Sequence, residues 1–216
     1  MSVPTELVKK LRETSGAPLL ECKKALEEAQ GDIEKAFTVL RKRGQATAAK
    51  KAGRVTSEGV VGAYIHAGGK MGVLVEVNCE SDFVARNEEF QQFVHDLAMQ
   101  ICATDPHFIR KEDVTVEVLK REKEILKEQA AASGKPESVL DRIVEGRLSK
   151  FYEDTCLYEQ HFIKDTTGAV TIGELIASKI AKFGENITVR RFARFKVGEG
   201  LAAPAGRALT EVPEGA

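Results

Sequence analysis

The sequence predicts an α+β protein in which a three-helix module, a linker and a core with a small three-stranded antiparallel sheet packed by helices follow one another. Three observations support this fold class. Apolar residues recur at helical spacing over residues 1–44, this periodicity is lost over the basic segment 45–57, and apolar runs typical of strands begin and end the core at 58–200. Residues 201–216, which contain two Pro and two Gly, are expected to form a flexible tail.

Turn residues and apolar stripes predict the three N-terminal helices. The segment 15–18 breaks the first helix, Gly31 closes the second, and Asp32 can cap the third, which we expect to end at Gly44. Each helix carries one apolar stripe, so that the three can form a compact bundle; the stripes are Leu7, Val8 and Leu11, then Leu19, Leu20, Ala25, Leu26 and Ala29, then Ile33, Ala36, Phe37 and Leu40. The following residues, 45–57, are small and basic, and we interpret them as a partly helical, mobile linker.

Strand patterns then alternate with helical ones. Residues 60–65 and 71–77 read as strands joined by a Gly-Gly turn, and we expect them to pair antiparallel. Asn87 begins a strong helical pattern. Further helices are predicted within 112–131, 136–152 and 171–182, followed by a last strand over 187–197 in which Phe192 and Phe195 are expected to face the core.

Charge is unevenly distributed along the 216 residues. Residues 1–56 hold 12 Lys and Arg against 7 Asp and Glu, whereas the whole chain has a net charge of −1. A basic N-terminal region suits nucleic-acid contact, docking on an acidic protein, or simply a solvated helix surface, and charge does not decide among them. No apolar run approaches the roughly 20 residues of a membrane span. The four cysteines form no CxxC pair, which indicates reduced thiols and a cytoplasmic location.

Motifs for catalysis or metal binding are missing. The four histidines are far apart and share no ligand spacing with the cysteines, so we expect neither a metal site nor a cofactor. The Gly-Lys pair at 69–70 is followed by Met71, where a phosphate-binding P-loop needs Ser or Thr. Cys79 and His66 could suggest a thiol nucleophile, but nothing in the sequence orients them. We therefore predict no catalytic residue, and favour a binding protein over an enzyme.

The segment CESDFVARN at 79–87 lies between a predicted strand and a predicted helix. Loops held by rigid elements commonly carry function, and Asp82 followed by Phe83 places an anion next to an aromatic ring. A structural alternative remains open, in which Asp82 caps the following helix while Phe83 and Val84 fold into the core.

An ordered set of motifs resembles the elongation factor Ts family over nearly the whole chain. The N-terminal TSGAPLLECKKALEEAQGDIEKA at 14–36 resembles the family's ubiquitin-associated-like module, and VNCESDFVARNEEF at 77–90 resembles its N-C-x-[ST]-D-F-V loop. Further similarity lies in YIHAGGKMGVLVEV, KPESVLDRIVEGRLSKF, QHFIKD and FGENITVRRFARFKVGEG. Pro18-Leu19-Leu20 departs from the family's common Gly-Met-Met.

This resemblance implies a guanine nucleotide exchange factor for elongation factor Tu. Ser81, Asp82, Phe83 and Val84 would form the loop that enters the partner beside its nucleotide and displaces its magnesium, and His66, Lys23 and Lys24 would make further contacts with the partner. Longer relatives have a duplicated core and an inserted coiled-coil hairpin, whereas this chain has one core copy. A homodimer or a two-plus-two complex is therefore expected, without direct nucleic-acid or membrane binding.

Two other functional classes remain as alternatives. One is a ribosome- or RNA-binding protein that uses the basic residues 1–56, and it requires an affinity that falls steeply with salt. The other is a peptide- or ubiquitin-binding adaptor built on the three helices, which would leave the Asp82–Phe83 segment without a role.

Overall fold

The computed structural model describes residues 3–131 and 137–200, and the predicted tail at 201–216 lies outside this range. Three helices open the described chain: α1 (Thr5–Ser15), α2 (Leu19–Glu28) and α3 (Ile33–Lys51). They share a small core of their own, formed by Val8, Leu11, Cys22, Ala25, Leu26 and Ala36. The three predicted helices are thus confirmed, and Asp32 caps α3 as expected by accepting a hydrogen bond from the Lys35 N–H at 3.0 Å.

The expected end of α3 at Gly44 is wrong. The helix runs through Gly44 to Lys51, because the residues after Gly44 are mostly Ala, Gln and Lys, which favour helix, and because this stretch packs against α8 (Ile172–Phe183). Gly44 is buried in that contact. Leu19 and Leu20 also differ from expectation, since they are 53% and 62% exposed and contribute nothing to the small core.

A three-stranded antiparallel sheet forms the centre of the molecule, in the order β1 (Glu58–Ile65), β2 (Met71–Cys79) and β3 (Ile187–Lys196). Tyr64 pairs with Val73 across the hairpin, and Val75 pairs with Phe192 across β2 and β3. The register shifts between Glu76 and Val77. The predicted sheet and its antiparallel pairing are confirmed.

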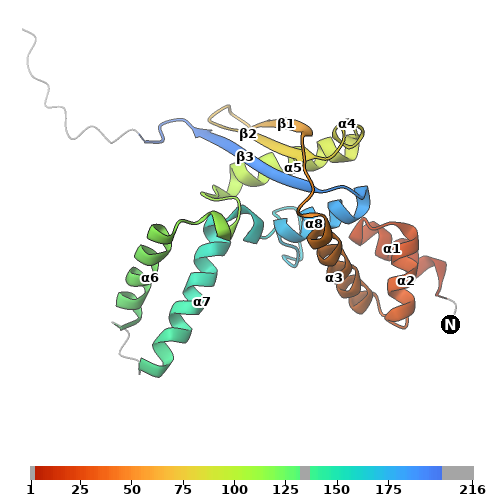
Figure 1. Ribbon diagram of the computed structural model, residues 1–216, viewed down its shortest axis with the longest axis horizontal. Coiled ribbons are helices and arrows are strands. Elements are labelled where there is room, and N and C mark those ends of the chain that lie inside the picture. The colour runs from red at the N-terminus through yellow and green to blue at the C-terminus, as the bar shows by residue number, and fades with distance from the viewer. Residues whose placement is uncertain (1–2, 132–136, 201–216) are drawn as a thin grey trace, which may run out of the picture.

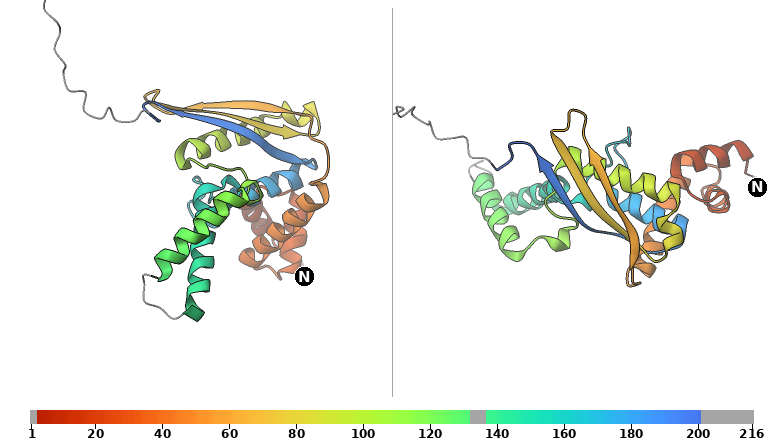
Figure 2. Two further views of the ribbon diagram at one scale, coloured as in Figure 1. Left: turned by 60° about the vertical axis from the view of Figure 1, so that its left-hand side comes forward. Right: turned by 90° about the horizontal axis from the view of Figure 1, so that it is seen from above.

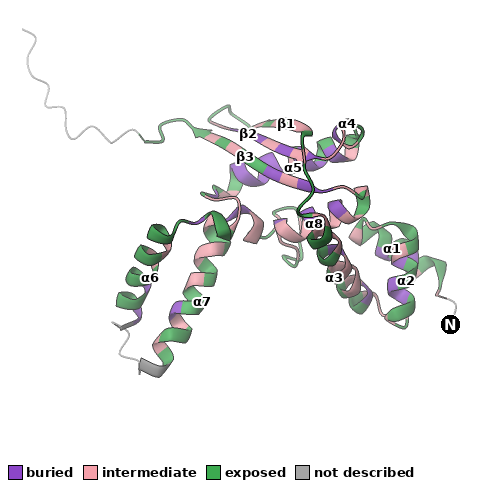
Figure 3. Ribbon diagram, viewed as in Figure 1, coloured by how far each residue is buried: buried purple, intermediate pink, exposed green. Residues whose placement is uncertain are grey.

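The helices lie on one side of the sheet (Figure 2). Helix α5 (Glu88–Thr104) covers the inner face, and α8 packs beside it. Figure 3 shows that buried residues gather on α5 and on the strands above it. Phe192 is half-buried against this core as expected, whereas Phe195 is 67% exposed, so its predicted place in the core is wrong.

Two further helices form an arm that projects from the core. Helices α6 (Val116–Ala131) and α7 (Glu137–Thr155) lie side by side and antiparallel (Figure 1), with a small core of Leu126, Ala130 and Val144 between them. They correspond to the helices expected within 112–131 and 136–152. Short 3-10 turns at Lys111–Asp113 and Leu157–Glu159 flank this arm, and the one-turn helix α4 (Asp82–Ala85) follows β2.

Candidate functional site

The segment Ser81–Val84, called here the 81–84 loop, follows the last buried residue of β2. Phe83 is 83% exposed, whereas Val84 packs against the main core and Ala85 is buried. The loop thus holds itself to the protein by Val84 and directs the ring of Phe83 into solvent. The alternative in which both Phe83 and Val84 fold into the core is therefore correct for Val84 and wrong for Phe83.

Asp82 does not cap a helix either. Ser81 occupies the N-cap position of α4, and α5 is capped by Asn87, whose side chain accepts a hydrogen bond from the Glu89 N–H at 2.9 Å. The Asp82 carboxylate instead lies 3.0 Å from the guanidinium of Arg86; the Arg86 side chain is largely exposed and that of Asp82 is about half exposed. The loop therefore presents an anion and an aromatic ring side by side at the surface.

A carboxylate from the other end of the chain anchors this loop. Glu185, in the turn between α8 and β3, accepts hydrogen bonds from the backbone N–H groups of Glu80 and Ser81 at 3.1 and 3.0 Å and from the Ser81 hydroxyl at 2.6 Å. Sequence reasoning missed Glu185. The only local signal is an acidic residue after the Gly184 helix end, and nothing in the sequence connects it with a loop 104 residues away.

Cys79 and His66 do not form a thiol–imidazole pair. Cys79 is buried next to the loop and donates a hydrogen bond to the Ser81 carbonyl oxygen at 3.2 Å. Burial, followed by the negative charge of Glu185, raises the pKa of its thiol to about 11. His66 follows the opposite end of β1, about 25 Å away at the rise of an extended strand. These observations exclude the thiol nucleophile.

His66 is exposed beside the β1–β2 turn, where its Nδ1 lies 3.1 Å from the Tyr64 hydroxyl. The Tyr64 ring in turn meets the His95 ring edge-on, with 5.6 Å between the ring centroids. The structure therefore gives His66 a defined setting, but within one chain it does not bring His66 near the 81–84 loop.

Lys23 and Lys24 lie on the exposed surface of α2, in the N-terminal module. Each is close to an acidic neighbour on its own helix: Lys23 to Glu27 at 3.9 Å, and Lys24 to Glu21 at 3.2 Å. The exposed Leu19 and Leu20 precede them by one turn, so α2 presents an apolar and basic surface separate from both other candidate sites.

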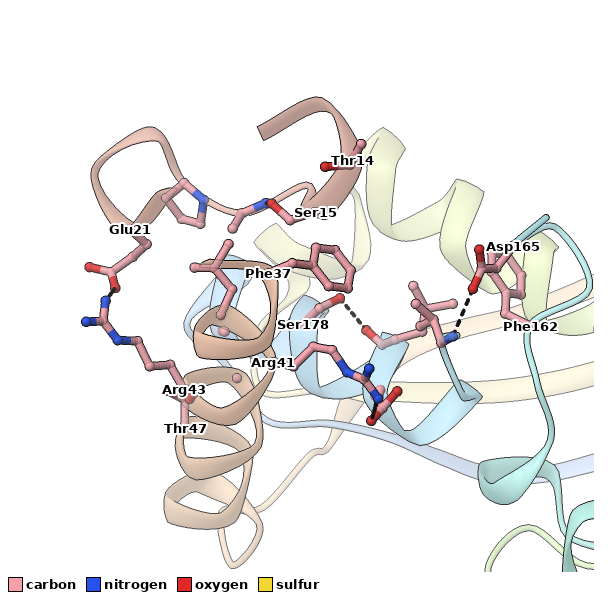
Figure 4. Close-up of a pocket in the computed structure, with 18 of the residues that line it drawn as sticks. Thr14, Ser15, Glu21, Phe37, Arg41, Arg43, Thr47, Phe162, Asp165 and Ser178 are labelled. Atoms are coloured by element: carbon pink, nitrogen blue, oxygen red, sulfur yellow. Dashed lines mark hydrogen bonds and ion pairs between the residues drawn. The ribbon is translucent and has the colours of Figure 1, made fainter. Parts of the chain in front are cut away.

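A cavity of ≈ 590 Å³ lies between the N-terminal module and the core, and its lining does not include the 81–84 loop. Figure 4 shows Phe37 and Arg41 of α3 on one side and Phe162, Asp165 and Ser178 on the other. Arg41 is paired with Glu174 across it, and the Ser178 hydroxyl donates to the Leu175 carbonyl oxygen at 2.7 Å. No histidine or cysteine lines this cavity, and its carboxylates are already engaged: Glu21 with Arg43, Glu174 with Arg41, and Asp165 with the Thr167 hydroxyl and the Val170 N–H.

Across residues 3–131 and 137–200, no group of three or more His, Cys, Asp or Glu side chains is arranged to hold a metal ion. The four cysteines are buried and free. None of the helices in the described part of the chain combines the length and the apolar character that crossing a bilayer requires.

Comparison with known proteins gives a consistent result. The family model described as elongation factor TS matches residues 8–199. The elongation factor Ts of Koribacter versatilis is 62% identical over 199 residues, which cover 92% of this chain and 90% of that protein. The elongation factor Ts of Solibacter usitatus is 58% identical over 204 residues (94% and 95%), and that of Carboxydothermus hydrogenoformans is 56% identical over 200 residues (93% and 91%).

Proposed function

Because the chain belongs to the elongation factor Ts family, we propose that its 81–84 loop carries out the activity of that family. The protein is a guanine nucleotide exchange factor for elongation factor Tu in translation elongation: it promotes release of GDP so that GTP can rebind. The observation that supports the loop assignment is the 83% exposure of Phe83 beside Asp82, on a short helix that starts after Ser81, which Glu185 holds, and ends at the buried Ala85. This exposure leaves the ring free to enter a partner, and aromatic side chains are enriched in the buried centres of protein interfaces.

The mechanism follows from how a G-protein holds its nucleotide. The phosphates are bound by a P-loop and by a magnesium ion, which demands near-ideal octahedral geometry and so tolerates little displacement of its ligands. In our proposal Phe83 enters an apolar pocket between partner helices and shifts them. Asp82 acts next to it, on the hydrogen bonds around the magnesium-binding segment. Ser81 and Val84 set the direction and depth of the loop.

Linkage limits what such a loop can do. If the exchange factor weakens nucleotide binding by some ratio, nucleotide weakens binding of the factor by the same ratio. The protein therefore accelerates exchange without selecting GDP or GTP, and the concentrations of the two nucleotides decide which one rebinds. No covalent bond forms or breaks in this proposal, so the protein needs no catalytic residue or cofactor and is not an enzyme by reaction class.

His66 and the α2 surface serve as further contacts with elongation factor Tu. The exposed Leu19 and Leu20 offer an apolar centre, and Lys23 and Lys24 lie beside them with their acidic neighbours, as the polar rim of an interface does. Residues 1–44 act as a docking module in this proposal, residues 45–57 connect it to the core, and the core at 58–200 carries the 81–84 loop. Its place in translation puts the protein in the cytoplasm with its partner.

A second copy of this chain covers the outer face of the sheet. The register places Val61, Ile65, Leu74 and Phe195 on that one face, and all four are at least half exposed. Such an apolar face, rimmed by the Glu76 pairs with Arg190 and Arg191, suits an isologous dimer interface. We propose that the protein is a homodimer that binds elongation factor Tu as a two-plus-two complex.

The RNA-binding alternative is less favoured by the arrangement of the basic residues. Arg43 is bonded to Glu21 and Glu28, and Arg41 to Glu174, so these cations are partly neutralised within the protein. Titration of RNA with increasing salt tests this directly, because phosphate contacts give an affinity that falls steeply with ionic strength. We expect no specific binding.

Release of a fluorescent GDP analogue from elongation factor Tu tests the loop assignment. We expect the parent chain to accelerate release strongly, and Phe83→Ala or Asp82→Ala to lose most of the acceleration while both variants remain folded. Val116→Ala serves as the control, because Val116 is 76% exposed at the start of the arm and away from the loop. Equal rates for Phe83→Ala, Asp82→Ala and the parent would refute the proposed role of the loop.

A further inference from the structure

The turn between α8 and β3 holds the base of the 81–84 loop by an unusually complete set of hydrogen bonds. One carboxylate oxygen of Glu185 accepts from the N–H groups of both Glu80 and Ser81, at 3.1 and 3.0 Å. The other oxygen accepts from the Ser81 hydroxyl at 2.6 Å. A single side chain thus satisfies two consecutive backbone donors and the neighbouring hydroxyl, and charge-assisted bonds of this kind are about twice as strong as neutral ones.

The connection also runs in the reverse direction. The Glu80 carboxylate accepts a hydrogen bond from the Asn186 N–H at 2.6 Å, so that residues 80–81 and 185–186 exchange bonds both ways. These reciprocal hydrogen bonds come directly after the last residue pair of the β2–β3 ladder, Cys79 with Ile187. Asn186 is itself only 3% exposed, and its side chain donates to the Arg54 carbonyl oxygen at 2.9 Å. The base of the loop is therefore tied to rigid structure on the side of β3.

The loop needs such an anchor. Helix α4 has four residues, too few to be stable by itself, and its N-cap residue Ser81 gives no side-chain cap because its hydroxyl is bonded to Glu185. Without that anchor the exposed ring of Phe83 would sample many directions, and a partner would have to order it on binding. A group held in place by a supporting shell avoids that entropic cost.

We infer that Glu185 is a positioning residue for nucleotide exchange: it fixes the backbone and hydroxyl of Ser81 and, through them, the direction in which Asp82 and Phe83 reach the partner. This inference rests on the proposed function of the 81–84 loop. It assigns Glu185 no contact with elongation factor Tu or with its nucleotide. Geometry, and not negative charge, is therefore the property of Glu185 that matters.

Two conservative substitutions separate geometry from charge. Glu185→Gln removes the charge but keeps the shape: its carbonyl oxygen can accept from both N–H groups, and its amide can donate to the Ser81 hydroxyl, which also accepts. Glu185→Asp keeps the charge but is one methylene shorter, so it cannot reach all three donors. Glu185→Ala removes the anchor altogether.

The experiment measures the release rate of a fluorescent GDP analogue from elongation factor Tu against the concentration of each variant, which separates the maximal rate from the half-saturating concentration. We expect Glu185→Ala to lower the maximal rate about 10- to 100-fold, as a misplaced reacting group does. Glu185→Asp should lower the maximal rate nearly as much. Glu185→Gln should stay within about threefold of the parent, because its bonds are weaker but in the same places.

Two further readouts report on positioning. Hydrogen exchange at the amides of residues 80–84 should accelerate in the Ala and Asp variants and not in the Gln variant. Adding Glu185→Ala to the Asp82→Ala/Phe83→Ala double variant should slow nucleotide exchange no further, because Glu185 acts through those two side chains. Glu174→Ala is the matched control. It also removes a carboxylate that joins two elements, since Glu174 at the far end of α8 pairs with Arg41 of α3, and it should leave the rate of nucleotide exchange unchanged.

Each contrary result overturns the inference in a distinguishable way. If Phe83→Ala abolishes exchange but the Ala and Asp variants of Glu185 match the parent, Glu185 does not position the loop, while the loop assignment stands. If Glu185→Gln is as slow as Glu185→Ala while its loop amides stay protected, the charge acts on the partner instead. If Phe83→Ala itself is fully active, the proposed function fails and this inference fails with it. Should Glu185→Ala not fold, the Asp and Gln pair decides the question.

Discussion

The carboxylate of Asp82 and the guanidinium of Arg86 are 3.0 Å apart, one helical turn from each other, with the exposed ring of Phe83 next to Asp82. The Arg86 side chain is 81% exposed and that of Asp82 45% exposed, and the Asp82 carboxylate takes no part in anchoring the loop base, which Glu185 holds. Exposed ion pairs contribute about 1 kcal/mol or less. The position of Asp82 therefore makes it available to a partner at little cost to the stability of its own chain.

Asp82→Ala and Arg86→Ala should each change the free energy of unfolding by less than about 1 kcal/mol, because the pair between them is exposed. Urea denaturation measures this change. In GDP release from elongation factor Tu, Asp82→Ala should lose most of the activity and Arg86→Ala much less. Equal losses in the two variants would mean that the ion pair, and not the carboxylate, is what the partner recognises.

Two phenylalanines of the same region, Phe83 and Phe90, should separate stability from function. Phe83→Ala should change the free energy of unfolding by no more than about 0.5 kcal/mol, because an exposed ring loses few contacts. Phe90 is fully buried and its ring lies 6.4 Å from that of Phe93 and 6.1 Å from that of Phe183. Phe90→Ala should therefore cost about 3–5 kcal/mol. Chemical denaturation of both variants checks the contrast, and a strong destabilisation by Phe83→Ala would contradict the exposed position of the ring.

Cys79 should resist alkylation in the folded protein. Burial, followed by the charge of Glu185, raises the pKa of its thiol from 9.0 to about 11, so almost no thiolate is present at pH 8. Iodoacetamide at pH 8, followed by peptide mapping, should modify Cys79 only after denaturation. Rapid labelling of Cys79 in the native state would show that the end of β2 opens.

The same pKa gives a prediction for alkaline stability. A thiol whose pKa is higher in the folded than in the unfolded state stabilises the protein fully below about pH 9, and this contribution is lost as the pH rises through about 11. The free energy of unfolding should therefore fall more steeply between these pH values in the parent than in Cys79→Ala. Parallel curves for the two proteins would show that the thiol does not contribute.

Periodicity was enough to predict the main elements, since stripes and alternation report burial directly. It failed where packing between distant segments decides. Gly44 reads as a helix end, yet contact with α8 keeps α3 helical as far as Lys51. Phe195 looks like a core residue, but the register across β2 and β3 places it opposite Gly72 on the open face of the sheet.

The 81–84 loop illustrates the same limit at the candidate site. Its residue types suggested a functional surface, but the sequence could not tell whether Phe83 or Val84 points inward. That direction depends on Glu185, which binds the loop base from 104 residues away. Local pattern therefore located the loop, and only the tertiary arrangement gave its orientation.

Acid should weaken the attachment of the loop base through Glu80. The hydrogen bond from the Asn186 N–H, with a further contribution from Arg54, holds the pKa of Glu80 below its usual value. A lowered pKa stabilises the fold above about pH 4.5, the usual value, and this contribution is lost as the pH falls through the folded pKa. Glu80→Gln should thus be less stable than the parent at pH 7, and the difference should shrink as the pH falls below 4.5 and through the folded pKa of Glu80. Glu124→Gln, at an exposed position on α6, is the control. A stability difference between Glu80→Gln and the parent that persists at low pH would show that it does not arise from the ionised Glu80 carboxylate.

The apolar outer face of the sheet predicts that a charge at its centre breaks the proposed dimer. Leu74 lies on the middle strand and is 50% exposed, directly opposite Ala63 and Ala193 of the two neighbouring strands. Leu74→Lys places two like charges against each other across a two-fold interface and desolvates both, so light scattering coupled to gel filtration should give half the molecular mass of the parent. The Leu74 side chain is half exposed in the single chain, so the substitution should not disturb the fold of the monomer. The circular dichroism spectrum should therefore be unchanged, and the unfolding midpoint should fall only by the amount that the dimer contributes. Val116→Lys, an equally drastic change on the exposed start of the arm, should leave the mass unchanged. A parent protein that is monomeric at micromolar concentration would refute the dimer and leave this apolar face to another partner.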